Sequence, residues 1–334
     1  VNNNSVIVLD LAEVNHDYAG KAKYTDFDYY EVNNDGLSDV IRAIDYAKTD
    51  KSIKGISIIN SGSKLGAAQT NWLRSSLEDF KTSKKFVYAY GDEMTQGEYY
   101  LNSVADSIYL NPVGALDFKG LSAELMFFKD LQEKSGIKME VIRHGKYKSA
   151  VEPFLQNEMS DANREQVTTM LQTSWNVIVD KVSKSRNISK EKLNAIADNL
   201  QARTPEMAKA ENLIDVVAYE DVYHNQIKKM LDVAEEKDYK SIKILYYAKN
   251  VATTSKVSAS DRIAVIYAQG QIMSGEGDVS YIGEGSMRRA IKEAREDDNV
   301  KAIVLRVDSP GGSALTSDLI WREIELTKGE KPVV

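Results

Sequence analysis

The sequence contains no cysteine among its 334 residues, and only five prolines, three histidines and three tryptophans. The absence of cysteine excludes disulfide bonds, thiol nucleophiles and thiolate metal sites, and it fits an oxidising compartment as well as a reducing one. Long apolar runs are also lacking, because no window approaches the roughly twenty apolar residues that a membrane helix needs. Asp297 and Asp308 have no partners at metal-ligand spacing, so we expect neither a metal nor a cofactor.

A basic stripe is absent as well. The net charge is -7, with acidic and basic residues interspersed, so a nucleic-acid partner is not expected. The content of 43% apolar and 28% charged residues is ordinary for a globular protein, and the length allows two domains. The sequence starts at Val1 without a methionine or a charged and apolar leader. We expect that a leader or anchor was removed, or that a longer gene product precedes this start.

One stretch of the sequence occurs twice. Residues 36–87 align without a gap with residues 283–334 at a constant offset of 247, and thirteen of the fifty-two positions are identical. The identical pairs include Arg42/Arg289, Ala43/Ala290, Ile44/Ile291, Ala47/Ala294, Asp50/Asp297, Lys54/Lys301 and Ile56/Ile303. The apolar pattern repeats with them, so we expect one supersecondary unit that is used twice.

Strand and helix patterns alternate along the first copy and its surroundings. Helices are expected at 36–48, 66–80 and 96–105, and strands at 6–11, 53–59, 86–90 and 107–110. The last of these strands should end at the breaker pair Asn111-Pro112. This alternation predicts an α/β fold with a mostly parallel sheet, helical layers and right-handed crossovers.

The pattern changes after Leu110. The elements expected there are extended pieces at 113–121, 138–142 and 213–215, and helices near 126–134 and at 161–185, 190–198 and 219–237, with a further helix start at Thr204-Pro205-Glu206. The second copy should form strands at 263–267 and 300–307 and helices at 286–295 and 314–326. These patterns divide the chain into a first repeat, 1–240, and the N-terminal part of a second, truncated repeat, 241–334.

The sharpest local signal follows the strand at 300–307. Residues 308–313 read Asp-Ser-Pro-Gly-Gly-Ser. Adjacent glycines between a buried strand and a helix N-terminus let the backbone approach a ligand, with unpaired N–H groups aimed at developing negative charge. A tight turn with Ser313 as the helix N-cap explains the same residues. The first copy, however, makes this turn without a glycine pair, which favours a function for Gly311 and Gly312.

A second signal is the basic loop 143–150, Arg-His-Gly-Lys-Tyr-Lys-Ser-Ala, which precedes Val-Glu-Pro-Phe. A lysine between a glycine turn and an apolar helix start can be partly desolvated, and desolvation lowers a lysine pKa toward the range in which it acts as a general base. The alternative is a loop of solvated lysines. His144 is interpreted as a polar loop residue, and Ser309 and Ser313 as turn and N-cap residues, rather than as catalytic groups.

Taken together, these features resemble the signal peptide peptidase A family, in its long bacterial form with two tandem repeats, within the Clp-protease and crotonase superfamily. The resemblance covers essentially the whole chain. It is carried by the repeat and by three motifs: Leu-Arg-Val-Asp-Ser-Pro-Gly-Gly-Ser at 305–313, Tyr-Lys-Ser-Ala-Val-Glu-Pro-Phe at 147–154, and Gln-Gly-Glu-Tyr-Tyr at 96–100.

The resemblance implies a serine protease with a Ser–Lys dyad. Lys148 matches the general base, Gly312 with Gly311 beside it matches the oxyanion turn, and Ser149 is a candidate for orienting the dyad. The family nucleophile lies in a Ser-Gly-Gly-Tyr context, and that slot in the first repeat is Gln96. Its counterpart in the second repeat would fall nine residues beyond Val334, so we expect these 334 residues alone to be inactive.

The resemblance also implies the biological setting. The expected substrates are short, largely apolar peptides such as cleaved signal peptides, and the expected assembly is a homo-oligomer, by family resemblance a tetramer. A membrane segment absent here would tether the body to the inner membrane, on the periplasmic side. Two alternatives stay open from the residues: a crotonase-like enzyme that holds an acyl-coenzyme A enolate with the same N–H pair, and a non-catalytic scaffold that captures peptides.

Overall fold

A computed structural model describes residues 4–14, 17, 21–24, 29–32, 36–254 and 259–334. The chain forms two compact units. One consists of Val1–Ala89 together with His224–Val334, and the other of Tyr90–Tyr223. The division at residue 240, which is based on sequence duplication, stays a prediction.

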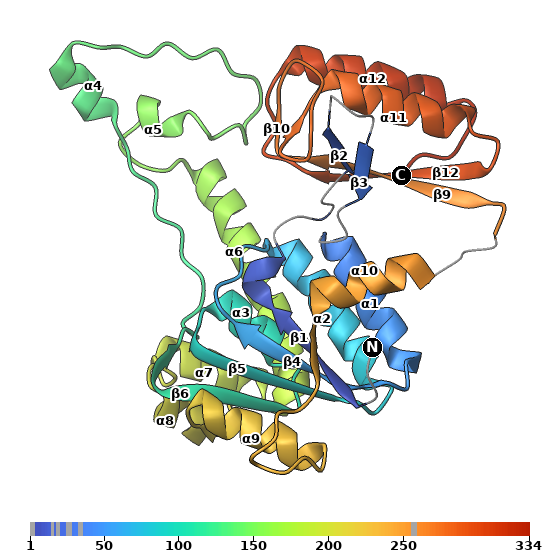
Figure 1. The fold of residues 1–334 in the computed structure, drawn as a ribbon. Coiled ribbons are helices and arrows are strands. Elements are labelled where there is room, and N and C mark those ends of the chain that lie inside the picture. Colours follow the sequence, from blue (N-terminus) through green and yellow to red (C-terminus); the bar gives the residue numbers. More distant parts are fainter. Residues whose placement is uncertain (1–3, 15–16, 18–20, 25–28, 33–35, 255–258) are drawn as a thin grey trace. The chain divides into compact units, whose positions relative to one another are not determined.

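The largest sheet has six strands in the order β7-β6-β5-β4-β1-β8 (Figure 1). Its strands are β1 (Ser5–Asp10), β4 (Ile53–Asn60), β5 (Phe86–Met94), β6 (Ser107–Leu116), β7 (Val216–Val217) and β8 (Ser241–Lys243). β1 pairs in parallel with β4 and β8, and β6 pairs in parallel with β7. Side chains on both faces of β4 are buried, as the apolar run predicted. The α/β fold with a mostly parallel sheet is therefore confirmed.

Helices α1 (Leu37–Thr49) and α2 (Ala67–Lys81) follow the amphipathic pattern of the first copy. α1 buries Val40, Ala43, Ile44 and Ala47 at helical spacing, because these side chains form its apolar face. It packs against α2 and against α10 (Ile244–Thr254). A short 3-10 helix (Leu11–Glu13) follows β1, and β2 (Lys21–Tyr24) and β3 (Tyr29–Val32) form an antiparallel pair.

The second copy repeats this arrangement. Helices α11 (Glu284–Glu296) and α12 (Ala314–Lys328) begin and end 247 residues after α1 and α2. Strand β12 (Val300–Asp308) pairs in parallel with β9 (Arg262–Gln269), and β10 (Gln271–Ile272) with β11 (Tyr281–Ile282). Ile266, Ile291 and Ile303 belong to the buried core between these elements.

A lysine closes the same helix end in both copies. Lys85 Nζ donates to the carbonyls of Ala47 and Asp50 at 2.6 Å each. Lys331 Nζ donates to the carbonyls of Ala294 and Asp297, the counterparts of these two residues, at 3.0 and 2.6 Å. The last carbonyls of a helix have no partner within the helix, so each lysine satisfies them and favours its C-terminus electrostatically. The helices and the acceptor carbonyls follow the offset of 247 seen in the sequence identities, whereas the two lysines lie 246 residues apart.

The unit Tyr90–Tyr223 is largely helical outside its strands. It contains α3 (Gln96–Asn102), α4 (Lys129–Ser135), α5 (Glu152–Leu155), α6 (Asp161–Arg186), α7 (Lys190–Asp198) and α8 (Pro205–Ala210), and α9 (Glu220–Met230) starts at its end. Thr204 caps α8 as predicted, because its side chain accepts from Met207 N–H at 3.3 Å. Among the helices of the described residues, none is long and apolar enough to cross a membrane.

Several expected boundaries are wrong. β6 does not end at Asn111-Pro112 but continues to Leu116. β7 pairs only with Tyr109 and Leu110, so Pro112 lies beyond that ladder and its missing N–H costs no bond to β7. The strand expected at 213–215 forms at Val216–Val217, residues 138–142 are irregular, and α9 ends at Met230. β8 and α10 were not expected.

Candidate active site

The predicted base, Lys148, lies in an irregular segment between α4 and α5. The turn before it includes Gly145, whose φ of 98° favours glycine, and Lys148 N–H lies 3.4 Å from the Gly145 carbonyl. The Lys148 side chain is exposed, as are residues 142–147. The partial burial expected from the sequence is therefore not provided within this segment. Its amine forms no ion pair or hydrogen bond with any residue that the structure describes.

The backbone of Lys148 is fixed by Arg143. One guanidinium nitrogen of Arg143 donates to the Lys148 carbonyl at 3.0 Å, and lies 3.7 Å from a carboxylate oxygen of Glu152. Glu152 is 1% exposed. It accepts from Ser160 Oγ at 2.6 Å, from Ser160 N–H at 3.3 Å and from Asn163 Nδ2 at 3.0 Å. Since Ser160 is the N-cap of α6, Glu152 attaches the lysine loop to the start of a 26-residue helix.

The Glu152 contacts predict a pH dependence of stability. Burial acts to raise the pKa of the Glu152 carboxyl, but the bonds from Ser160 and Asn163 and the charge of Arg143 outweigh it, so the pKa lies below its usual value. A lowered folded-state pKa contributes stability above the unfolded-state pKa, and this is lost as the pH falls through the folded-state pKa. The free energy of unfolding should therefore fall more steeply between about pH 6 and pH 3 in the native chain than in Glu152→Gln.

Urea unfolding across this pH range measures the effect. We expect the difference between the native chain and Glu152→Gln to shrink by about 1.5–3 kcal/mol toward the acid end, the usual size for a hydrogen bond to a charged group. Exposed Glu165→Gln, which lies in the same helix, serves as the control and should show no such slope. Parallel pH curves for the native chain and Glu152→Gln would contradict the role assigned to these bonds.

The other polar residues of the loop have modest contacts. Ser149 is half-buried, and its carbonyl accepts from Glu152 N–H at 2.9 Å. This bond places it one turn before α5, while its role in orienting the dyad stays a prediction. His144 is exposed, and His224 Nδ1 lies 2.8 Å from Tyr239 Oη. His16 lies outside the described residues. Within the described ranges, no cluster of acidic or histidine side chains could hold a metal ion.

The glycine turn follows β12 directly. Gly311 N–H donates to Ser309 Oγ at 3.1 Å, and Ser313 Oγ accepts from Thr316 N–H at 3.2 Å, so the turn and N-cap roles of the two serines are confirmed. Gly312 is exposed, and its N–H finds no acceptor in the part of the chain that the structure describes. An unpaired N–H at the start of a 15-residue helix is a donor that an anion can use.

Only glycine fits at position 312. Ile272 N–H donates to the Gly311 carbonyl and Ser313 N–H donates to the Ile272 carbonyl, both at 2.9 Å, so β10 passes close to the turn. A Cβ at Gly312 would lie 2.0 Å from the Ile272 carbonyl oxygen. The first copy has Leu65 at this place in the alignment. The close approach of β10 therefore requires glycine at position 312, whereas Gly311 is favoured by its φ of 98°.

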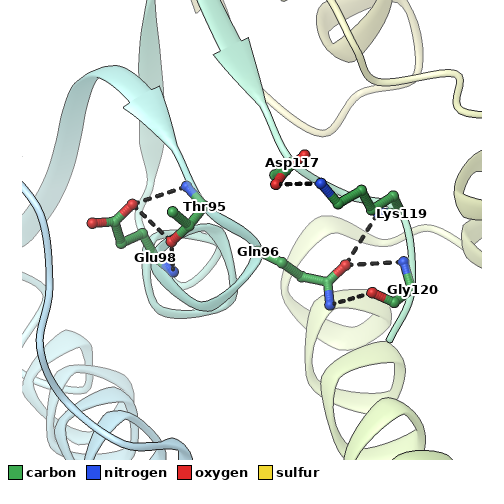
Figure 2. A network of polar contacts seen from close by, with 6 residues as sticks. All are labelled: Thr95, Gln96, Glu98, Asp117, Lys119 and Gly120. Atoms are coloured by element: carbon green, nitrogen blue, oxygen red, sulfur yellow. Dashed lines mark hydrogen bonds and ion pairs between the residues drawn. The ribbon is translucent and has the colours of Figure 1, made fainter. Parts of the chain in front are cut away.

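The slot of the expected nucleophile in the first repeat holds Gln96, the first residue of α3. Figure 2 shows its side chain reaching the backbone at Lys119 and Gly120. Its Oε1 accepts from Lys119 N–H at 3.1 Å and from Gly120 N–H at 3.0 Å, while its Nε2 donates to the Gly120 carbonyl at 3.0 Å. These bonds use the polar atoms of the carboxamide. Gln96 therefore has a structural role, joining α3 to the segment after β6.

Next to Gln96, α3 begins with a capping box. Glu98 accepts from the N–H and Oγ1 of Thr95, both at 2.8 Å, and Glu98 N–H donates to Thr95 Oγ1 at 3.3 Å (Figure 2). This reciprocal pair satisfies N–H groups at the helix start. The spacing Thr-x-x-Glu carries the signal in the sequence.

The two predicted parts of the site belong to different units. Lys148 lies in Tyr90–Tyr223, whereas Gly311 and Gly312 lie in the unit that includes His224–Val334. Sequence reasoning missed Arg143 and Glu152, which hold the lysine loop. The available signal was an acidic residue between two apolar neighbours, Val151 and Pro153, at a helix start.

An α/β fold with a mostly parallel sheet, a lysine loop and a glycine turn before a helix is consistent with a peptidase, and the comparisons agree. Residues 79–234 match the sequence model of peptidase family S49. Protease 4 of Haemophilus influenzae is 34% identical over 307 residues, and Protease 4 of Salmonella typhi is 35% identical over 314. The chloroplastic serine protease SPPA of Arabidopsis thaliana is 30% identical over 312 residues. The chain belongs to the signal peptide peptidase A-like proteins of family S49.

The extent of these alignments is uneven. They cover 89%, 91% and 90% of this chain, but 50%, 50% and 45% of the respective relatives. The chain thus spans about half the length of the curated relatives it matches.

Proposed function

We propose that the chain contributes the base and the oxyanion turn of a serine endopeptidase that works with a Ser–Lys dyad. The observation that carries this proposal is the unpaired N–H of Gly312, held at the start of α12 by a turn that admits only glycine. The unpaired amine of Lys148 and the family S49 relatives support it. The nucleophilic serine is not among these residues, because the sequence has no Ser-Gly-Gly-Tyr segment.

The chemistry follows from these groups. A neutral Lys148 amine takes the proton of the serine hydroxyl, and the serine oxygen attacks the scissile carbonyl of the peptide. The tetrahedral oxyanion accepts a hydrogen bond from Gly312 N–H, which is preorganised by its turn. The lysine ammonium then gives its proton to the leaving amine, and water hydrolyses the acyl enzyme with the same lysine as base. Arg143 and Glu152 hold the backbone of Lys148 during these steps.

The mechanism also requires that the Lys148 amine is shielded from bulk water. An amine in bulk water is protonated at neutral pH, so the exposed Lys148 has to be enclosed before it can serve as a base. The surrounding segment carries exposed apolar side chains, among them Met126, Leu131, Ile137 and Ile142. Apolar groups of this kind are typical of surfaces that contact other chains. We propose that a homo-oligomer, by family resemblance a tetramer, encloses the site on the periplasmic side of the inner membrane.

Hydrolysis of an internally quenched, largely apolar peptide tests the proposal. We expect none from a sample whose intact mass equals that of these 334 residues, because the nucleophile is missing. Cleavage that copurifies with this mass, and that a change at Lys148 does not affect, would refute the dyad. Reading the coding sequence past Val334 for a Ser-Gly-Gly-Tyr segment tests the remaining part of the proposal.

A further inference from the structure

Four polar side chains join the first copy to the second. Gln69 of α2 donates from Nε2 to Asp17 Oδ1 at 3.0 Å and to Asp308 Oδ2 at 3.2 Å. Arg306 of β12 forms an ion pair with Asp17 through Nε. The guanidinium of Arg306 also lies over the ring of Trp72, 4.4 Å from its centroid. We call Asp17, Gln69, Arg306 and Asp308 the cross-copy cluster.

The cluster combines two carboxylates with one guanidinium, and part of it is inaccessible to solvent. Asp17 is 1% exposed and Gln69 is 9% exposed. A buried carboxylate is costly without a partner, so the Arg306 guanidinium makes the burial of Asp17 possible. Gln69 is also fixed from the other side, because its Oε1 accepts from Gly66 N–H at 2.8 Å and caps α2. A single glutamine therefore ties the start of α2 to both carboxylates of the cluster.

The place of the cluster in the second copy connects it with the glycine turn. Asp308 is the last residue of β12 and directly precedes the turn 309–313. Its carbonyl accepts from Gly270 N–H at 2.9 Å, one residue before β10, the strand that carries both bonds to the turn at Ile272. A cavity of about 680 Å³ opens beside the cluster, lined by residues of both copies. Polar contacts, rather than close apolar packing, join α2 to the end of β12 here.

The contacts are not a by-product of the duplication. At the offset of 247, Gln69 and Trp72 correspond to Thr316 and Leu319, and Arg306 and Asp308 to Ile59 and Ser61. Ile59 and Leu319 have no polar side-chain atoms, and Ser61 and Thr316 donate instead to Asp10 and Glu284. The segment 61–66, which is the first copy's version of the glycine turn, leads directly into α2. Gln69 and Trp72, which contact the second copy, thus follow directly after the segment that aligns with the glycine turn.

We propose that Asp17 and Gln69 of the first repeat are positioning residues for the glycine turn of the second copy, acting through Arg306 and Asp308. The cluster fixes the end of β12, so that Ile272 can hold Gly311 and Ser313 and leave Gly312 N–H unpaired. The catalytic meaning of this coupling rests on the proposed function. The coupling itself is a property of these 334 residues and needs no nucleophile.

Amide hydrogen exchange, resolved by NMR, tests the coupling in the whole chain. The reporters are the amides of Ile272 and Ser313, which bond to Gly311 and Ile272. The reference is the Ile303 amide, which bonds to the Pro332 carbonyl in the core of the same copy. Gln69→Glu keeps an acceptor for Gly66 but removes the donor and adds a charge between two carboxylates. Asp17→Asn is the milder variant, keeping an acceptor for Gln69 and removing the charge that faces Arg306.

We expect both variants to accelerate exchange at Ile272 and Ser313 by at least about 10-fold relative to Ile303. Glu98→Gln, which changes the corresponding capping residue of α3, is the matched control and should leave the ratio within about twofold. An unchanged ratio in Asp17→Asn would overturn the proposal. Equal acceleration at all three amides would also overturn it, because this is the result of general destabilisation.

Trp72 fluorescence provides an independent measurement. In a Trp175→Phe, Trp321→Phe background, Trp72 is the one remaining tryptophan. Asp17→Asn should shift its emission if Arg306 leaves the ring, while a shift without faster exchange at Ser313 would contradict positioning of the turn. Loss of coupling and loss of hydrolysis are distinguishable. Exchange reports the coupling in these residues, whereas hydrolysis also requires the serine.

Discussion

Replacing Lys148 by alanine is expected to abolish peptide hydrolysis in any form of the protein that also carries the nucleophilic serine. The amine is the proposed acceptor of the serine proton, and loss of a general base costs about 10²–10⁴-fold in rate. The fall should appear in kcat, with KM changed little, because the amine contacts the reacting atoms rather than the bound peptide. Steady-state kinetics on the quenched apolar peptide measure both constants.

Two further variants separate a base from a positive charge. Lys148→Arg keeps the charge but cannot lose its proton, so it should be as inactive as Lys148→Ala. Lys146→Ala is the matched control, because Lys146 lies two residues away in the same exposed loop, with its amine 5.3 Å from the centroid of the Tyr147 ring. It should retain activity within about twofold. Substantial activity in Lys148→Arg would show that the lysine is not the base.

Replacing Gly312 by alanine should disrupt the glycine turn. The added Cβ would meet the Ile272 carbonyl at 2.0 Å, so either β10 or the turn has to move. Overpacking of this kind costs about 1–3 kcal/mol, and the bond from Ser313 N–H to Ile272 is lost with it. Displacement of an oxyanion donor also lowers kcat by about 10²-fold or more in a form that carries the serine.

Gly311→Ala is the control for this prediction. Gly311 has a φ of 98°, so alanine is strained there, at a cost of about 1–2 kcal/mol, but its Cβ would meet no atom within 4 Å. Urea unfolding should therefore rank Gly312→Ala below Gly311→Ala in stability, and exchange at the Ser313 amide should be faster in Gly312→Ala. The reverse order would mean that the close approach of β10 does not constrain the turn.

The sequence predicted local structure well where the pattern itself determines it. Helices α1, α2, α11 and α12 were expected within one or two residues of their bounds, because amphipathic spacing and capping are local. Errors occurred where long-range pairing decides. Pro112 does not end β6, since it lies beyond the residues that pair with β7. β8 forms because Ser241, Ile242 and Lys243 pair with β1 at the edge of the sheet.

The residues of the candidate site also fall into those that local sequence predicts and those that depend on long-range contacts. Lys148 and Gly312 could be proposed from motifs, because their neighbours in sequence are also their immediate surroundings. Glu152 and Asp17 could not, since a buried carboxylate is defined by partners that only folding brings near. Ser160 and Asn163 follow Glu152 within eleven residues, whereas Arg306 lies 289 residues after Asp17.

The carboxamide of Gln96 has a consequence for the history of a duplicated chain. A serine at this position would lose the bonds to Lys119 and Gly120, and the same copy has no glycine pair to receive an oxyanion. One substitution therefore removes an anchor without restoring chemistry. Under the proposed function, the first copy provides the lysine but depends on the second copy for the oxyanion donor, and selection cannot easily reverse this dependence. The two copies are then inherited together.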